Sequence, residues 1–373
     1  MSAFNRRTFL ALSALSAAGL ATWTELAGKA STRRGRLAMT YETSAENGVA
    51  LMNLDTAEFK TFATPRNVHY IETSKRNPHF GIGANKYGRY FSEIDLQTGT
   101  VVEVHQVDED LSLMGHMALS DDGQFLCATA TDASNRNLIL KMDPKSFRVL
   151  DRISIGVENP APHDLRFMRG SRTLLTTSAR ALTYVDFSTN KVTHRRVKDL
   201  SDESVIRHFG ANEAGQVAIQ ANSIGDLNKP VWKYGKGEIV TASHDSNLSP
   251  EHIRTFHPTG DFTTQFDREL LDFAFSADGM IFGATMNRQP LVTFWDFKTG
   301  QIIHSLWIPG ANRIGLTHNR SHFIVFGRFG VRYISAATLE HDPSLNQFDA
   351  EFAALFPKTV SPVFGHKSLL EPA

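Results

Sequence analysis

The sequence predicts an all-β fold, a seven-bladed β-propeller built from four-stranded antiparallel blades. Two recurring patterns lead to this prediction. In the first, a hydrophobic run ends in an acidic residue, and a short turn leads into another hydrophobic run. In the second, a glycine-containing turn joins two short runs that are rich in β-branched and aromatic residues. Each unit then contains four strands, and radial repetition of such units leaves no long exposed sheet edge.

The acidic position of the first pattern recurs at intervals of roughly 40 to 60 residues, which is typical of propeller blades. Clear copies are "FSEIDLQTGTVVEV" and "VTFWDFKTGQIIHSL". Aspartate stands there in five units, and Lys233 and Ser335 take its place in two degenerate ones; the five are Asp55, Asp95, Asp143, Asp186 and Asp296. We expect the last four of these carboxylates to accept hydrogen bonds from turn amides.

The second pattern is clearest in "MALSDDGQFLCATA" and "FAFSADGMIFGATM". Two further segments, residues 246–256 and 345–358, have capping residues or apolar spacing that permit short helices. A propeller's first and last units must meet, so we expect residues 36–42 to join the last repeat near residues 323–335. The propeller is expected to span residues 31–340, followed by a C-terminal tail over 341–373.

Residues 1–30 are typical of a twin-arginine export signal. Arg6 and Arg7 precede a short apolar segment, and small residues follow near Ala30, where we expect cleavage. The segment is short and rich in Ala and Ser for a membrane span. The alternative is a retained anchor. The prediction is therefore a periplasmic protein with no stable membrane span after cleavage.

Composition excludes several classes of function. The formal net charge is zero, which argues against nucleic acid as a partner. Cys127 is the single cysteine and lies in a hydrophobic run, so the chain forms no internal disulfide and no haem attachment motif. No P-loop, His-Glu-x-x-His or Gly-x-Ser-x-Gly motif occurs. We expect a monomer and predict no catalytic residue.

Histidine recurs at one position of the repeat. His116, His163 and His208 each precede the turn glycine of their unit by seven residues, Asp272 does so in a later unit, and His69 stands in the equivalent place. The first strand of a propeller unit lines the central channel, so these side chains should converge at one channel mouth. Imidazole and carboxylate together suit iron, copper or zinc.

Two alternatives to a metal site remain open. Nearby Arg66, Arg207 and Arg313 would make the same mouth a site for an anionic ligand or cofactor. Alternatively, the histidines hydrogen-bond between blades and hold strands in register, as histidines of WD repeats do.

Several stretches, among them "GHMALSDDGQFLCAT", "PHDLRFMRGSRTLL" and "SVIRHFGANEAGQVAIQ", resemble a bacterial family of exported seven-bladed propellers of unknown function with YVTN- and WD-like repeats. The resemblance covers about residues 36 to 335, but region 223–270 departs from it. Members are often encoded beside imelysin-type iron-uptake proteins, which implies periplasmic iron or metal handling with such proteins as partners.

The sequence therefore predicts a non-catalytic propeller that binds a metal, a metal complex or a partner protein at its channel mouth. A metal-dependent hydrolase or oxidoreductase built on the same histidines is one alternative. A pure protein-interaction scaffold is the other. Fold alone does not choose among them, because propellers host all three kinds of function.

Overall fold

The computed structural model describes most of the chain after the predicted export signal. The described residues are 34–43, 46–73, 77, 79–156, 162–168, 170–178, 181–197, 204–212, 215–223, 238–243, 253–256, 270–286, 291–327, 329–355 and 363–370. The predicted signal over residues 1–30 lies outside them. Within the described residues, no helix has the length and apolarity needed to cross a lipid bilayer.

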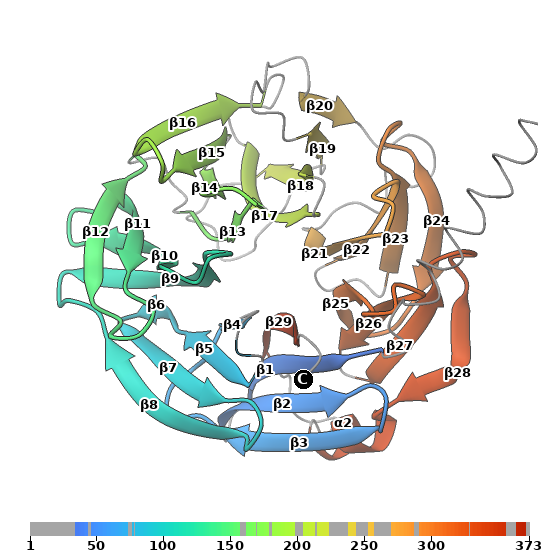
Figure 1. The fold of residues 1–373 in the computed structure, drawn as a ribbon. Coiled ribbons are helices and arrows are strands. Elements are labelled where there is room, and N and C mark those ends of the chain that lie inside the picture. The colour runs from blue at the N-terminus through green and yellow to red at the C-terminus, as the bar shows by residue number, and fades with distance from the viewer. Residues whose placement is uncertain are drawn as a thin grey trace, which may run out of the picture.

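The described strands form seven antiparallel sheets arranged around a central axis (Figure 1). This confirms the prediction of an all-β propeller.

Four sheets read as follows from the axis outward. The first sheet is β29 (Val363–Leu370), β1 (Arg36–Glu42), β2 (Asn47–Asn53) and β3 (Glu58–Ala63), and the second is β4 (Tyr70–Thr73), β5 (Phe80–Ala84), β7 (Tyr90–Asp95) and β8 (Thr100–Gln106). The third sheet is β6 (Lys86–Gly88), β9 (Leu111–Leu119), β10 (Leu126–Asp132), β11 (Asn137–Met142) and β12 (Val149–Ser154). The fourth sheet is β13 (Leu165–Phe167), β14 (Thr173–Ser178), β15 (Ala181–Asp186) and β16 (Lys191–Arg196).

The other three sheets follow in the same order. They are β17 (Ser204–Ala211), β18 (Gln216–Ser223), β19 (Glu238–Ser243) and β20 (Ile253–Phe256); β21 (Leu270–Phe275), β22 (Ile281–Met286), β23 (Leu291–Asp296) and β24 (Ile302–Trp307); and β25 (Ala311–Leu316), β26 (His322–Gly327), β27 (Gly330–Ser335) and β28 (His341–Gln347). Six sheets have the four strands predicted. The third has a fifth, β6, which pairs with the inner edge of β9.

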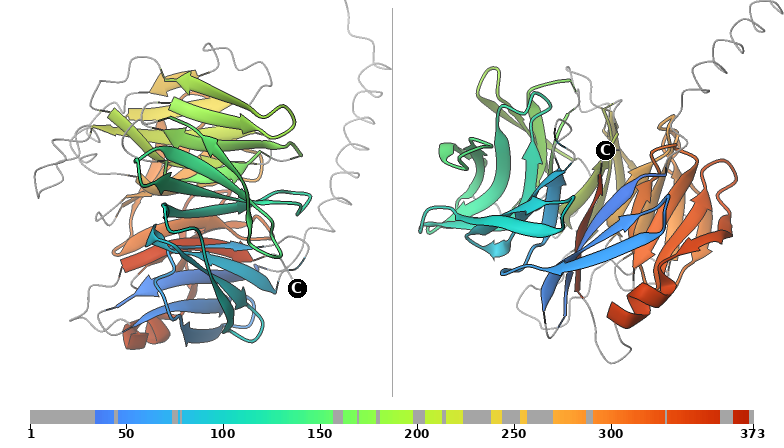
Figure 2. Two further views of the ribbon diagram at one scale, coloured as in Figure 1. Left: turned by 90° about the vertical axis from the view of Figure 1, so that its left-hand side faces the viewer. Right: turned by 60° about the horizontal axis from the view of Figure 1, so that its bottom comes forward.

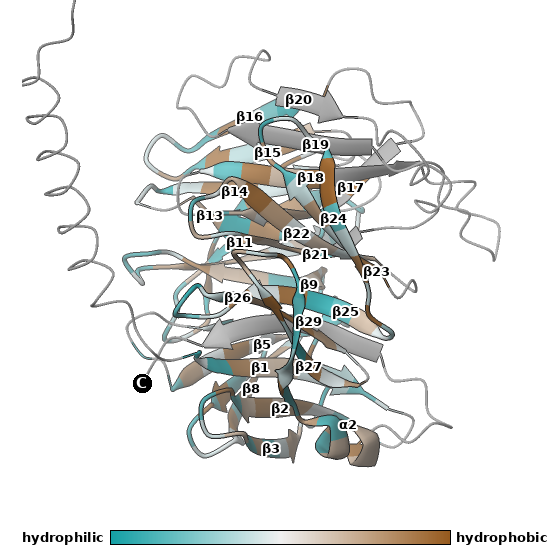
Figure 3. Cartoon of the chain, turned by 90° about the vertical axis from the view of Figure 1, so that its right-hand side faces the viewer, coloured by the Kyte–Doolittle hydropathy of each residue, from teal (hydrophilic) through white to brown (hydrophobic). Residues whose placement is uncertain are grey.

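The core lies between neighbouring sheets, because the middle strands are buried on both faces. β10 and β23 are buried along almost their whole length, whereas the outer β12 is mostly exposed. Hydrophobic residues accordingly follow the middle strands, and hydrophilic ones gather at turns (Figure 3). Trp295 stacks on Phe282 with ring centroids 6.0 Å apart. Cys127 is fully buried, as predicted, and burial raises the pKa of its thiol.

Four of the five recurring aspartates close turns, as the sequence predicts, whereas Asp55 accepts the backbone amides of Arg34 and Gly35. The Asp95 carboxylate accepts hydrogen bonds from the backbone amides of Gln97 and Thr98, at 2.8 and 2.9 Å. These amides, that of Thr98 first, lower the pKa of Asp95. Asp143 accepts from the amides of its own turn in the same way, so this repeat position is structural.

The assignment of Lys233 to the acidic position is wrong. β18 pairs with β19 so that Gln216 faces Ser243, in the register in which Thr173 faces Asp186. Ser243 therefore occupies the position, and Lys233 lies outside the described residues. The pattern misleads because the run Glu238–Ser243 follows a Tyr-Gly-Lys-Gly turn, which predicts the fourth strand of the unit, whereas it forms the third. The helix expected over 246–256 is also wrong at its end, since Ile253–Phe256 forms β20.

The predicted ring closure is right in part. Residues 36–42 pack with residues 323–335 in one hydrophobic core, but they share no sheet; β1 pairs on its inner side with β29, from the far C-terminus (Figure 2). The tail was expected to lie outside the propeller, but its residues 341–347 form β28 and its residues 363–370 form the innermost strand of the first sheet. The short helix predicted over 345–358 is confirmed as α2 (Asp349–Leu355).

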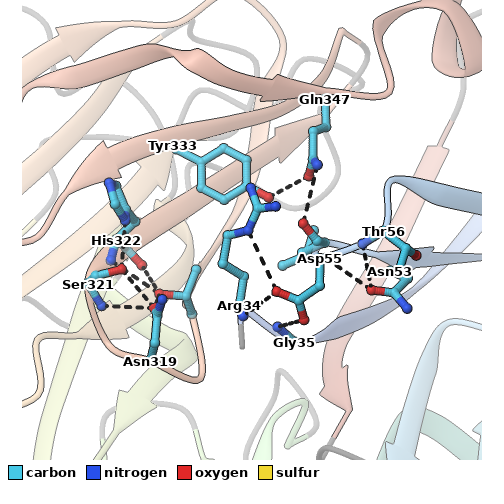
Figure 4. A network of polar contacts seen from close by, with 12 residues as sticks. Arg34, Gly35, Asn53, Asp55, Thr56, Asn319, Ser321, His322, Tyr333 and Gln347 are labelled. Atoms are coloured by element: carbon cyan, nitrogen blue, oxygen red, sulfur yellow. Dashed lines mark hydrogen bonds and ion pairs between the residues drawn. The ribbon is translucent and has the colours of Figure 1, made fainter. Parts of the chain in front are cut away.

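A polar network ties the first sheet to the last (Figure 4). The Arg34 amide donates to Asp55 at 2.7 Å, and the Arg34 guanidinium lies 5.5 Å from the centre of the Tyr333 ring. The Tyr333 hydroxyl donates to Gln347 at 2.6 Å, and the Gln347 amide donates to the Leu54 carbonyl at 3.2 Å. The seam is thus held by side chains from both ends of the described chain.

Candidate metal centre

The structure brings the four predicted histidines together near the axis. The ring centroids of His69 and His116 lie 5.5 Å apart, those of His116 and His163 4.5 Å, and those of His163 and His208 4.9 Å. The residues come from four successive sheets: His69 directly precedes β4, His116 lies in β9, His163 precedes β13, and His208 lies in β17. We call them the histidine cluster.

The equal seven-residue offsets do not reflect equal backbone register. The amide of Ser120 closes the first turn of its sheet, and that of Met168 closes the equivalent turn. His116 stands four residues before Ser120, whereas the residue four before Met168 is Asp164. Relative to the first turn of its sheet, His163 therefore lies one residue earlier in the chain than His116 does. The two turns are equally long, and the equal offset arises because Gly170 stands one position earlier in its turn than Gly123 does.

Irregular pairing places His116 and His208. Regular pairing of β9 with β10 shifts at Thr129, and that of β17 with β18 shifts at Gln220, so each histidine lies in a β-bulge. A bulge bends the strand and re-aims the side chain. At these bulges the inner strands direct side chains toward the axis, and a regular strand would place the same side chains elsewhere.

Gly115 allows His69 to approach the β9 backbone. Its φ is +104°, and a Cβ atom built there would lie 2.6 Å from Cδ2 of His69 and 3.2 Å from Cβ of Lys86. Any side chain at this position would collide with the ring and would also be strained by the backbone angle. The Gly-His pair seen in the sequence thus has a packing reason.

Buried threonines fix the backbone of two cluster residues. The Thr40 hydroxyl of β1 donates to the His69 carbonyl at 3.3 Å, and the Thr129 hydroxyl of β10 donates to the His163 carbonyl at 3.4 Å. Both threonines are fully buried. Each bond runs from one sheet to the next, so the sheets and the cluster are positioned together.

The contact of His163 defines its tautomer. Nδ1 of His163 lies 3.1 Å from the Met114 carbonyl oxygen, which can only accept, so Nδ1 carries the proton and Nε2 keeps its lone pair. Nδ1 of His116 lies 3.2 Å from Oδ1 of Asp164, which places a carboxylate beside this ring without a hydrogen bond between them. Metal-binding histidines commonly donate their other ring nitrogen to a carbonyl or carboxylate in this way.

Three residues that the sequence did not single out surround His116. Tyr70 stacks on its ring at 4.9 Å, and the Tyr70 hydroxyl donates to Glu72 at 2.9 Å. The other carboxylate oxygen of Glu72 accepts the Leu119 amide at 2.9 Å. Asp164 was present in the quoted motif Pro-His-Asp, but only the fold shows that it serves the histidine of the neighbouring sheet.

Three cluster histidines are buried, and burial favours the neutral form of His163. His116, His163 and His208 are 2, 4 and 6% exposed. Burial lowers the pKa of His163 well below 6.5, and the neighbouring His116 and Lys86 lower it further. Lys86 belongs to β6, the extra strand on the inner edge of β9. A neutral imidazole is the form that binds metals.

The donor set fits a transition metal. One ligand atom from each of His69, His116 and His163 can be chosen so that all lie within 4.8 Å of one another. Zinc–nitrogen bonds are about 2.0–2.1 Å long, so donor atoms this close together are candidates to share one ion. Imidazole suits zinc, copper and iron.

The other predicted site residues have different surroundings. Asp272 accepts the Ile314 amide at 3.1 Å, which links β21 to β25, and it is not in this three-residue group. Arg66 is exposed and lies over the Tyr90 ring at 4.5 Å. Arg313 is buried and donates to the Asn312 carbonyl at 3.2 Å. The Arg207 side chain lies outside what the structure describes, so the anion site stays a prediction.

The fold and the cluster define a β-propeller with histidines from successive inner strands gathered near its axis. Residues 62–341 match the family described as "Protein of unknown function (DUF1513)", and the chain belongs to this family. This confirms the predicted membership of a propeller family of unknown function. No curated protein sequence matches the chain.

Similar solved structures share the propeller fold. Hydrazine synthase from Kuenenia stuttgartiensis has a TM-score of 0.62 at 12% identity, covering 78% of this chain and 90% of that one. The Cps50 (Swd1) β-propeller domain of Myceliophteria thermophila has a TM-score of 0.53 at 13% identity, covering 78% and 89%. U3-55K has a TM-score of 0.53 at 14% identity, covering 75% and 81%. At these identities the likeness concerns the fold alone.

Proposed function

We propose that the histidine cluster binds one transition metal ion, zinc, copper or iron, and that the protein acts in metal handling without catalysing a reaction. The observation that carries the proposal is the set of His69, His116 and His163, the last two buried, whose ligand atoms lie within 4.8 Å of one another. The second observation is that Nδ1 of His163 faces the Met114 carbonyl oxygen, so that Nε2 carries the lone pair.

The proposal extends to cellular location and architecture. The Arg6-Arg7 leader supports export to the periplasm by the twin-arginine route, which carries folded proteins. Iron-uptake proteins of the periplasm are the partners that the family resemblance supports. Seven blades are the count that the seven described sheets support.

Metal analysis and titration test the function. The full-length protein purified from the periplasm should hold a transition metal near one equivalent, and the metal-stripped protein should take up Zn²⁺ with the same stoichiometry. The double variant His116→Ala/His163→Ala should lose this binding. His194→Ala, an exposed histidine on the outer strand β16, is the matched control and should bind as the wild type does.

The double variant must be shown to fold, by an unchanged β-sheet circular dichroism spectrum. A wild-type protein that takes up none of Zn²⁺, Cu²⁺ or Fe²⁺ would overturn the proposal. So would a folded double variant that binds as tightly as the wild type.

A further inference from the structure

A second group of metal-type ligands lies on the outer part of the second sheet. Glu93 belongs to β7, and Glu103 and His105 belong to β8, the outermost strand (Figure 1). One ligand atom from each can be chosen so that all three lie within 4.8 Å of one another. We call these residues the outer triad. It shares no residue with the histidine cluster.

The pairing of β7 with β8 places the three side chains on one face. Glu93 lies directly opposite Glu103, and Phe91 lies opposite His105. Side chains two residues apart on a strand project from the same face of a sheet. The pairing then shifts between Glu93 and Ile94, and such a bulge bends the strand and re-aims nearby side chains. The backbone therefore gathers two carboxylates and one imidazole at one place.

Aromatic packing fixes the His105 ring. It stacks on Phe91 with ring centroids 5.4 Å apart, and its centroid lies 4.3 Å from that of the Phe147 ring. Phe147 is buried and belongs to the turn between β11 and β12, in the third sheet. The imidazole is thus held between two sheets while its Nε2 atom faces both glutamates of the triad.

The distances within the outer triad resemble those between ligands of one ion. Nε2 of His105 lies 3.4 Å from Oε2 of Glu93 and 3.7 Å from Oε2 of Glu103. A charge-assisted hydrogen bond between nitrogen and oxygen is shorter, about 2.7–2.9 Å. Ligands that lie about 2.0–2.1 Å from a tetrahedral ion are about 3.4 Å from one another. The spacing therefore leaves room for an ion among the three groups.

The charge of the outer triad also favours a cation. Carboxylates directly opposite each other destabilise a sheet, because like charges repel. Among the described residues, neither Glu93 nor Glu103 forms an ion pair with lysine or arginine. Arg152 of β12 is held instead by Asp108 and Asp110, each at 2.6 Å. A bound cation would relieve the repulsion between the two glutamates.

We propose that Glu93, Glu103 and His105 bind a divalent metal ion at the rim of the propeller, independently of the histidine cluster. Carboxylates suit Mn²⁺, and a mixed carboxylate and imidazole set also suits Zn²⁺. The Glu103 side chain is 64% exposed, so the remaining coordination positions of the ion are open to water or to a carboxylate of another molecule. A site this open should bind Zn²⁺ more weakly than the buried histidine cluster and fill only in excess metal.

Titration with Mn²⁺ tests the inference in the full-length protein. Mn²⁺ is the probe because it suits carboxylates, whereas three imidazoles suit zinc, copper or iron. Electron paramagnetic resonance of free Mn²⁺ gives the affinity. The wild type and His116→Ala/His163→Ala should each bind one Mn²⁺ equally well. Loss of an outer-shell partner alone costs about 10- to 100-fold in affinity, so Glu93→Gln/Glu103→Gln and His105→Ala should lose at least that much.

Glu58→Gln is the matched control. Glu58 is an exposed glutamate of β3, the outer strand of the first sheet, and its variant should bind Mn²⁺ as the wild type does. Glutamine keeps the shape of glutamate and removes the repulsion between residues 93 and 103. The metal-free Glu93→Gln/Glu103→Gln protein should therefore melt at or above the wild-type temperature, which shows that it folds.

The inference and the proposed function fail in different ways. A wild type that binds no Mn²⁺, or a folded Glu93→Gln/Glu103→Gln variant of unchanged affinity, overturns the inference and leaves the histidine cluster untouched. Mn²⁺ binding that is lost in His116→Ala/His163→Ala and kept in Glu93→Gln/Glu103→Gln places the ion at the histidine cluster and also overturns the inference.

Discussion

Two sides of the ring use one backbone position for different purposes. On β9 and β17, His116 and His208 stand four residues before the residue whose amide closes the first turn, and both enter the histidine cluster. On β21 and β25 the same position holds Asp272 and Arg313. Asp272 ties its sheet to the next through the Ile314 amide, and Arg313 is buried.

The difference shows that repeat position alone does not define a ligand. Asp164 occupies the same register as Asp272, and each carboxylate accepts an amide of the next inner strand, of Phe209 at 3.4 Å in one case and of Ile314 in the other. Asp164 also contacts the ring of His116. The position therefore links neighbouring sheets at two places in the ring, and at one of them the same carboxylate lies beside a cluster histidine.

The largest effect should come from removing the strand that closes the ring. A chain ending at Leu355 lacks β29, so β1 loses its inner partner and β4 loses a neighbour. We expect loss of the cooperative thermal transition, together with loss of Zn²⁺ binding. A truncated protein with the wild-type melting temperature would show that β29 is dispensable for closure.

The comparison between the two aspartates predicts that one alanine variant loses Zn²⁺ affinity and the other loses stability. Asp164→Ala should lower Zn²⁺ affinity by about 10- to 100-fold, because His116 loses the carboxylate beside its ring. Asp272→Ala should leave that affinity unchanged and lower the free energy of unfolding by about 1–3 kcal/mol, because the Ile314 amide loses its partner. Competition with a chelator measures the Zn²⁺ affinity, and urea unfolding measures the free energy of unfolding. Equal losses of affinity in both variants would contradict the distinction.

A smaller effect is expected at Gly115. Gly115→Ala introduces a Cβ at 2.6 Å from the His69 ring, and such overpacking costs typically about 1–3 kcal/mol. The ring must shift, so Zn²⁺ affinity should fall as well. Gly156→Ala is the control, because its φ of +108° brings the same strain with no atom within 4 Å. Equal stability and affinity in the two variants would refute the packing role.

The smallest effect concerns pH. The folded-state pKa of His163 lies well below the unfolded value of 6.5, so the folded protein takes up fewer protons there. Its contribution to stability is full above about 6.5 and is lost as pH falls toward the folded value. The melting temperature of the metal-free wild type should therefore drop more between pH 7.5 and pH 5.5 than that of His163→Gln. Parallel curves would contradict this assignment.

The sequence by itself determined the repeat, the all-β fold and the residue type of the cluster. Strand alternation, turn glycines and the turn aspartates are local signals, because each depends on hydrogen bonds within a few residues, as at Asp95. Those signals also located four histidines on inner strands or just before them. They failed where spacing was irregular, as at Lys233, since an insertion moved the third strand away from its expected place.

Only the tertiary structure decided which end of the chain closes the ring and which side chains serve the cluster. β29 follows a helix and lies far from β1 in sequence, so no local pattern pairs them. Asp164 and Thr129 act on residues of neighbouring sheets, and such contacts arise only when the sheets pack round the axis. Register also depends on bulges, which form from the balance of pairing and packing across two strands and leave no fixed spacing in the sequence.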